Sequence, residues 1–247
     1  MYKLLSTSES VSCLPNEGQF IDEVKDIMRD SCWDSEKHMP WPYIKTVWHR
    51  YWDESKFYLV EKSPPNLVRS KLIEENFNQP LFIISVRNPY AHCEGLIRRR
   101  NGWDEKKAVE FCIFCLKEQM KNSQILKNTI VTTYEDFCDH PLDFFEDLSQ
   151  IIPDLGKVDI SQEFSIHSID GPLTRSIINL NNKKIKRLSV NSIRKINYYL
   201  YQENDLMKFW GYEYYEPSFW HDIQRFFLIT QDLWIRAQKK IKKNKKK

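Results

Sequence analysis

The chain has 247 residues, with 37 lysines and arginines against 34 acidic residues and a formal net charge of +3. The last nine residues, KKIKKNKKK, contain seven lysines, and removing their charge leaves −4 for the rest of the chain. The body therefore lacks the bulk positive charge that would favour nucleic acid as its main partner, and we expect no nucleic-acid partner. A chain of this length can bury one sizeable core.

Cysteine usage and hydropathy predict a cytoplasmic protein. The cysteines are scattered and show no dense framework of paired spacings, which favours a reducing compartment. They are Cys13, Cys32, Cys93, Cys112, Cys115 and Cys138. No apolar run approaches the roughly 20 residues of a membrane span, and the first ten residues lack the apolar core of a signal peptide. We therefore expect no transmembrane segment.

The first two thirds of the chain alternate between strand and helix patterns. The runs rich in β-branched and aromatic residues, predicted as buried strands, are Phe57 to Val60, Leu81 to Val86 and Thr129 to Thr133. The stretches predicted as helices are Pro64 to Phe77, Pro89 to Arg100 and Asp104 to Lys121. This order predicts an α/β fold with a parallel sheet flanked by helices. Ligands of such sheets bind beyond the carboxyl ends of the strands.

The last third of the sequence is helical. Ser189 is placed to cap a helix, and a further helix is predicted to begin near Ser218. Its apolar face comprises Phe219, Ile223, Phe226, Thr230, Leu233 and Ala237. We expect a main α/β domain over residues 1–215 and a C-terminal amphipathic helix with a basic tail over 216–247. A helix docked on its own domain with a solvated tail explains this pattern more simply than a membrane-surface element.

Two strand-to-helix turns have the same construction. They read Glu-Lys-Ser-Pro at residues 61–64 and Val-Arg-Asn-Pro at residues 86–89. In each, a cation ends the strand, a Ser or Asn can cap the next helix, and Pro suits its first position. Lys62 and Arg87 thus stand beside helix N-termini, which already favour anions. Structural ion pairs at the sheet edge are the alternative, but the recurrence favours a ligand with two anionic groups.

The order of several motifs resembles that of sulfotransferases. These motifs are EKSPPN, LFIISVRNP, TTYEDF with Pro141 downstream, the stretch INLNNKKIKRLSVNSIRKINYYL, and FWGYEYY. Together they cover roughly Leu4 to Tyr215 and are most similar to bacterial and tyrosylprotein-type members. The resemblance implies a sulfotransferase fold of the P-loop NTPase type. It also implies the donor 3′-phosphoadenosine 5′-phosphosulfate (PAPS), no catalytic metal, and in-line transfer of a sulfuryl group to an acceptor hydroxyl.

The resemblance assigns roles to particular residues. Arg87 matches the arginine that grips the 3′-phosphate of the donor, a task suited to a planar guanidinium. Lys62 matches the lysine that steadies the transferring group and neutralises its growing charge. Glu17, in CLPNEGQF, matches the glutamate that takes the acceptor's proton. A surface carboxylate in a loop is the alternative interpretation of Glu17.

The sequence also departs from the family pattern. A serine usually follows the phosphate-gripping arginine by eight residues, and Gly95 stands there, which weakens the expected 3′-phosphate contact. The glycine-containing basic loop found near the end of the family is not recognisable. Family members usually begin with a strand and a Ser/Gly/Thr-rich loop whose backbone amides hold the 5′-phosphosulfate of the donor. Residues 1–15 resemble the helix that follows this loop, and this sequence shows no such strand and loop before Met1. A misplaced start, a fragment and a decayed protein are the three explanations.

The acceptor is expected to carry a hydroxyl group, as a carbohydrate, a tyrosyl peptide or a small molecule does. Variable loops form acceptor pockets in the family, and here they correspond to Ser31–Tyr51 and Gly156–Ile178. The first contains or adjoins Trp33, Trp41, Trp48 and Trp52. These aromatic side chains either wall an acceptor pocket or belong to the core. The sequence carries no indication of oligomeric state.

Two other function classes compete with the sulfotransferase interpretation. A nucleotide kinase or other P-loop transferase would need a Gly-Lys pair followed by Ser or Thr, which the sequence lacks. A non-catalytic, sulfotransferase-like protein would bind nucleotide or a protein partner without chemistry.

Two further residue groups have structural interpretations. Cys112 and Cys115 are expected on the core face of a helix, not in a zinc site. Tyr134, Glu135 and Asp136 are expected to pack under or cap the helix after the third strand.

Overall fold

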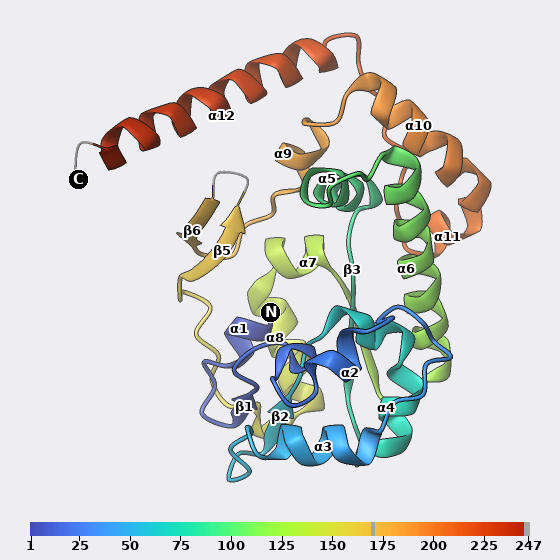
Figure 1. The fold of residues 1–247 in the computed structure, drawn as a ribbon, viewed down its shortest axis with the longest axis vertical. Coiled ribbons are helices and arrows are strands. Elements are labelled where there is room, and N and C mark those ends of the chain that lie inside the picture. Colours follow the sequence, from blue (N-terminus) through green and yellow to red (C-terminus); the bar gives the residue numbers. More distant parts are fainter. Residues whose placement is uncertain (169–170, 245–247) are drawn as a thin grey trace. The chain divides into compact units, whose positions relative to one another are not determined.

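The computed structural model describes residues 1–168 and 171–244 and divides into two compact units. The first unit comprises Met1–Ser85 and Glu118–Glu163. The second comprises Val86–Lys117 and the chain from Phe164 onward. The chain is α/β, with two small parallel sheets flanked by helices (Figure 1).

The first unit contains most of the strands. Its elements are α1 (Tyr2–Leu5), β1 (Val11–Cys13), η1 (Gly18–Phe20), α2 (Lys25–Arg29), α3 (Trp41–His49), β2 (Tyr58–Val60), η2 (Pro64–Val68), α4 (Ser70–Asn76), β3 (Phe82–Val86, ending at the unit boundary), the end of α6 (Glu105–Ile125), β4 (Thr129–Thr133), α7 (Tyr134–Asp139), α8 (Pro141–Ile151) and η3 (Pro153–Leu155). The three strands predicted from β-branched runs are confirmed as β2, β3 and β4 to within one residue.

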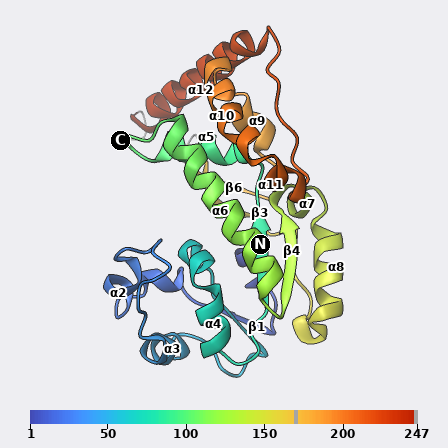
Figure 2. The ribbon, with the colours of Figure 1, turned by 90° about the vertical axis from the view of Figure 1, so that its right-hand side faces the viewer.

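The strands of the first unit pair in twos. In one parallel pair, Val11 of β1 lies opposite Tyr58 of β2 and Cys13 lies opposite Val60. The other sheet joins β3 to β4, which run side by side in Figure 2. The predicted flanked parallel arrangement is therefore present as two separate pairs.

Two local expectations are wrong. The helix expected over the first 15 residues ends at Leu5, and Val11–Cys13 forms a strand because it finds a parallel partner in β2. The helix expected over Pro64–Phe77 is interrupted at Arg69, whose backbone leaves the helical region with φ −120° and ψ 3°. At this break the buried Arg69 side chain donates to the carbonyl of Met28 at 3.2 Å and 3.3 Å.

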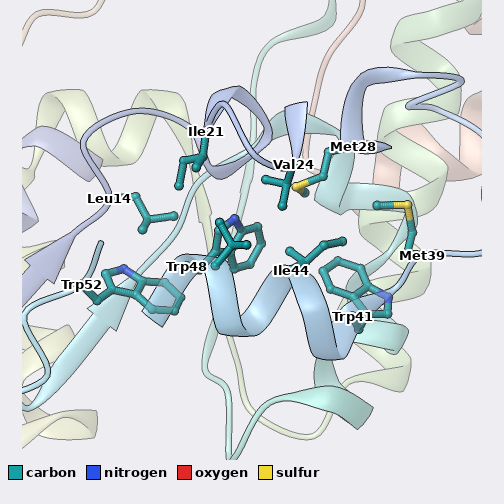
Figure 3. Packing of buried hydrophobic residues seen from close by; sticks show 10 residues of the cluster. Leu14, Ile21, Val24, Met28, Met39, Trp41, Ile44, Trp48 and Trp52 are labelled. Carbon is teal, nitrogen blue, oxygen red and sulfur yellow. The ribbon is translucent and has the colours of Figure 1, made fainter. Parts of the chain in front are cut away.

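A tryptophan-rich core fills the first unit around α3 (Figure 3). Trp41, Trp48 and Trp52 are all less than 10% exposed, and Trp48 makes edge contacts with the other two. The buried members of the cluster are Leu14, Ile21, Val24, Met28, Met39, Trp41, Ile44, Val47, Trp48 and Trp52. Of the two interpretations of these tryptophans, core packing therefore holds for the three, and they do not wall an acceptor pocket.

The second unit is mainly helical. Its elements are α5 (Pro89–Arg99), the first part of α6, β5 (Phe164–Ser168), β6 (Gly171–Arg175), α9 (Asn181–Ile185), α10 (Val190–Leu200), η4 (Tyr201–Glu203), α11 (Asn204–Phe209) and α12 (His221–Asn244). The strands β5 and β6 pair antiparallel. They fall within the predicted acceptor loop Gly156–Ile178, of which residues 169–170 and the side chains of 165–175 lie outside the described part.

Several predicted caps and contacts are confirmed. The Asn88 side chain accepts from the amides of Tyr90 and Ala91 at the start of α5, at 3.1 Å and 3.3 Å. Ser189 caps α10 by accepting from the Ser192 amide at 3.0 Å. These bonds satisfy amides that have no partner within the helix.

Other structural interpretations are settled by burial and hydrogen bonding. Cys112 is fully buried, whereas Cys115 is only partly so. Thr133, rather than an acidic residue, caps α7 by accepting from the Asp136 amide, and its hydroxyl donates back to the Asp136 carboxylate.

The last helix, α12, is attached to the second unit by polar side chains. The imidazole of His221 donates to the Leu188 carbonyl at 2.9 Å, and Arg225 donates to the Arg187 carbonyl at 2.8 Å. The predicted apolar face exists but is exposed, so the expectation that this face docks on the domain is wrong. Within the described residues, no helix is long and apolar enough to cross a membrane.

Trp48→Ala tests the importance of the tryptophan core. Removing this fully enclosed indole leaves a cavity, and we expect a loss of about 3–5 kcal/mol in the free energy of unfolding, measured by urea titration. Phe57→Ala, at a 73% exposed position of the same unit, is the control and changes stability by about 0.5 kcal/mol or less. Equal effects of the two substitutions would contradict the core assignment.

Candidate functional site

Glu17 and Lys62 meet at one edge of the β1–β2 sheet. Because the two strands are parallel neighbours, the loop after β1 and the turn after β2 leave the sheet at the same end. Glu17 forms an ion pair with Lys62, and its second carboxylate oxygen accepts from the side-chain Nε2 of Gln19 at 2.6 Å. The lysine side chain is 51% exposed and the glutamate side chain 25%, so both remain accessible.

A partly buried carboxylate organises this edge. Glu61 accepts hydrogen bonds from the Gly18 amide at 2.9 Å and from the side chains of Ser63 and Asn66. Burial, followed by the Glu17 charge, raises the pKa of Glu61 to about 6, although the hydrogen bonds from Ser63 and the Gly18 amide and the Lys62 charge favour its ionised form. Ser63, expected as a helix cap, makes no capping bond. Its hydroxyl instead donates to Glu61 and accepts from the backbone amide of Gln19 at 3.1 Å.

Gly18 lets the loop approach the core closely. A Cβ atom at this position would lie 2.7 Å from the Trp48 ring and 2.9 Å from a Glu61 oxygen. The Trp48 indole also donates to the Gly18 carbonyl at 3.3 Å. Glu17 is thus held next to Lys62 by a loop that rests on the tryptophan core.

Arg87 lies in the second unit, at the turn from β3 into α5. Its Nε donates to the buried Asn181 side chain at the start of α9, at 2.8 Å. Asn88 and Pro89 begin α5 as predicted, and because Asn88 already accepts from the first amides of the helix, the guanidinium of Arg87 stands beside a capped helix start.

Two further cations lie beside Gly95, one turn and a half along α5. A Cβ atom at Gly95 would lie 3.4 Å from a guanidinium nitrogen of Arg99 and 3.5 Å from the amine of Lys184. Burial and the nearby Arg87 charge lower the pKa of Lys184 to about 7. Burial, followed by the Arg98 charge, also lowers the pKa of Arg99. We call Arg87, Arg99 and Lys184 the cation cluster.

Two buried carboxylates hold the surrounding helices together. Glu94 pairs with Arg98 at 2.8 Å and with Arg187 at 3.5 Å. Asp232 of α12 pairs with Arg187 and with Lys183, the latter at 3.2 Å. The Glu94 charge also favours the charged forms of Lys184 and Arg99, but burial outweighs it and the pKa of each is lowered.

The sequence predicts four of the residues at these two places. They are Glu17, Lys62, Arg87 and Gly95, and the structure pairs the first two in one unit and places the last two in the other. The lysine-rich run at 183–186 was visible, but only the packing of α9 against α5 shows that Lys184 belongs with Arg87. For Glu61, the sequence shows only that it lies in the turn before Lys62, and nothing in it predicts a role in holding the Glu17 loop.

Two surface hollows lie away from these groups. One of about 260 Å³ lies between the start of α6 and α10, and another of about 340 Å³ lies over α8. Among residues 1–168 and 171–244, no group of three or more His, Cys, Asp or Glu side chains is arranged to hold a metal ion.

Comparisons with protein-family models, with curated proteins and with solved structures find no match to this chain.

Lys184→Met tests whether the cation cluster is a cost to the fold. The folded-state pKa is lowered, so the charged amine destabilises the fold below pH 7, and this cost disappears as pH rises from about 7 to 10.5. We expect Lys184→Met to stabilise the protein by about 1–2 kcal/mol at pH 6.5 and by much less at pH 10. The effect is limited because solvent screens part of the amine's charge.

Urea unfolding at the two pH values measures this difference. Lys186→Met, at an exposed position in the same lysine-rich run, serves as the control and leaves stability unchanged. A loss of stability in Lys184→Met at pH 6.5 would show that the amine has a stabilising partner and would overturn the interpretation.

Proposed function

We propose that this protein is a sulfotransferase that uses PAPS to transfer a sulfuryl group to an acceptor hydroxyl. The observation that carries the proposal is the cation cluster at the β3–α5 turn, at the position where the family resemblance expects the 3′-phosphate. The proposed fold is accordingly of the sulfotransferase, P-loop NTPase type. Its α/β organisation with small parallel sheets is compatible with that class.

The cation cluster suits a phosphate group for electrostatic reasons. A dianionic phosphate would restore a favourable environment for the charged form of Lys184, whose pKa is lowered by burial and by Arg87. Arg87 and Arg99 supply guanidinium groups, which bind phosphate oxygens through paired hydrogen bonds. Two cations beside Gly95 thus take the place of the hydroxyl that a serine would provide at that position.

The Glu17–Lys62 pair supplies the groups that transfer would need. Glu17 takes the proton of the acceptor hydroxyl while the acceptor oxygen forms a bond to sulfur. The bond between sulfur and the bridging oxygen of the donor breaks, and its electron pair stays on the departing adenosine 3′,5′-bisphosphate. Lys62 neutralises the charge that grows on these oxygens. The acceptor class remains a carbohydrate, a tyrosyl peptide or a small molecule.

A nucleotide-binding protein without transfer is the second candidate. The observation that favours it is that Glu17 already has two partners, Lys62 and Gln19. The Glu17–Lys62 ion pair can therefore have a structural role that needs no acceptor. Both candidates require the cation cluster to bind an anion, and they differ only in the chemistry of the Glu17–Lys62 pair.

Binding of adenosine 3′,5′-bisphosphate tests the cation cluster. By titration calorimetry, we expect this ligand to bind at least about tenfold more tightly than adenosine 5′-monophosphate, because only the former has a 3′-phosphate. Lys184→Met and Arg87→Met remove that preference, whereas Lys186→Met keeps it. Equal affinity for both nucleotides in the natural protein would remove the support for the proposal.

Transfer is tested with labelled PAPS and three acceptor classes: tyrosine-containing peptides, sugars and phenols. We expect Lys62→Ala to lower kcat about 100- to 1000-fold with little change in bisphosphate binding, because its charge acts on the reacting oxygens. Lys157→Ala, at an exposed loop position of the same unit, leaves both unchanged. Bisphosphate binding without transfer to any acceptor would instead favour the second candidate.

A further inference from the structure

The helix α12 presents its apolar side chains outward. Counted at 100° per residue, His221, Arg225 and Asp232 lie within about 40° of one another on the helix, and they contact the rest of the second unit. The exposed apolar side chains occupy the opposite side. On or just before the helix, these are Phe219, Trp220, Ile223, Phe226, Phe227, Leu233 and Trp234.

This orientation is the reverse of an ordinary surface helix. An amphipathic helix usually buries its apolar stripe and exposes its polar side. Here His221 and Asp232 are 2% and 3% exposed, whereas Phe226 and Trp234 are 65% and 62% exposed. The ion pairs of Asp232 with Lys183 and Arg187 fix the polar side inward, so the unit itself does not cover the aromatic side. A contiguous exposed apolar surface of this kind marks an interaction site.

The sequence at the end of the helix indicates the chemistry of the partner. Seven lysines occupy residues 239–247, directly after the aromatic segment. Tryptophan and phenylalanine next to a lysine run are the composition of helices that lie in the interface of a membrane with anionic lipids. A second copy of the chain would carry the same basic run, so charge complementarity favours an anionic surface.

We propose that α12 is a membrane-surface anchor, in which the exposed aromatic side enters the headgroup region of an anionic bilayer and the lysine run contacts its acidic lipids. The helix lies on the membrane and does not cross it. The anchor is independent of the proposed sulfotransferase activity, since its residues are separate from the cation cluster and from the Glu17–Lys62 pair.

Co-sedimentation of the full chain with vesicles tests the anchor. We expect binding to phosphatidylcholine vesicles that contain phosphatidylserine, and at least about tenfold weaker partitioning to phosphatidylcholine alone or at high salt. The double variant Phe226→Ser with Trp234→Ser weakens partitioning at least about tenfold, because both side chains are exposed in the free protein and buried in the lipid interface.

The matched control is Tyr198→Ser, a change at a 64% exposed aromatic position on α10, which leaves partitioning unchanged. Replacing Lys239, Lys240, Lys242 and Lys243 by glutamine weakens binding to the anionic vesicles at least about tenfold. Equal binding to both vesicle types, or full binding by the double variant, overturns the proposal. A dimer in sedimentation velocity that the double variant converts to monomer also overturns it, because the aromatic side is then an interface between two copies.

Discussion

Glu94 neutralises cations that would otherwise repel one another across the packed helices of the second unit. Its carboxylate is buried between Arg98 of its own helix and Arg187, and Arg187 in turn reaches Asp232. A carboxylate in such a place must be paired, because an isolated buried charge is strongly unfavourable. This chain of ion pairs joins α5 to the segment between α9 and α10 and to α12. It keeps Lys184 near Arg87 despite their like charge and sets which side of α12 faces inward.

Local sequence signals predicted the elements that a run of a few residues marks. These are the β-branched runs of β3 and β4 and the Asn88 and Ser189 caps, and all are present. Expectations failed where a distant partner decided the outcome. Val11–Cys13 became a strand because β2 lies beside it, and the helix after Pro64 broke where Arg69 reaches Met28.

The candidate site shows the same division. Lys62 and Arg87 were recognised because each ends a strand before a proline-initiated helix, a pattern within five residues. Lys184 follows Arg87 by nearly a hundred residues, and only the packing of α9 on α5 brings them together. The tryptophans near α3 illustrate the opposite problem, because aromatic residues have the same composition signal in a pocket wall as in a core. Burial alone separates these alternatives.

The close contact of Gly18 with Trp48 also constrains how this sequence can change over evolution. Any side chain at position 18 would overlap the indole ring or the Glu61 carboxylate. A larger residue at 18 is therefore compatible with the fold only if position 48 becomes smaller and the Glu61 carboxylate also moves away. Among natural relatives, we expect positions 18 and 48 to vary together, so that this pair would identify homologues that keep the Glu17 loop in the same place.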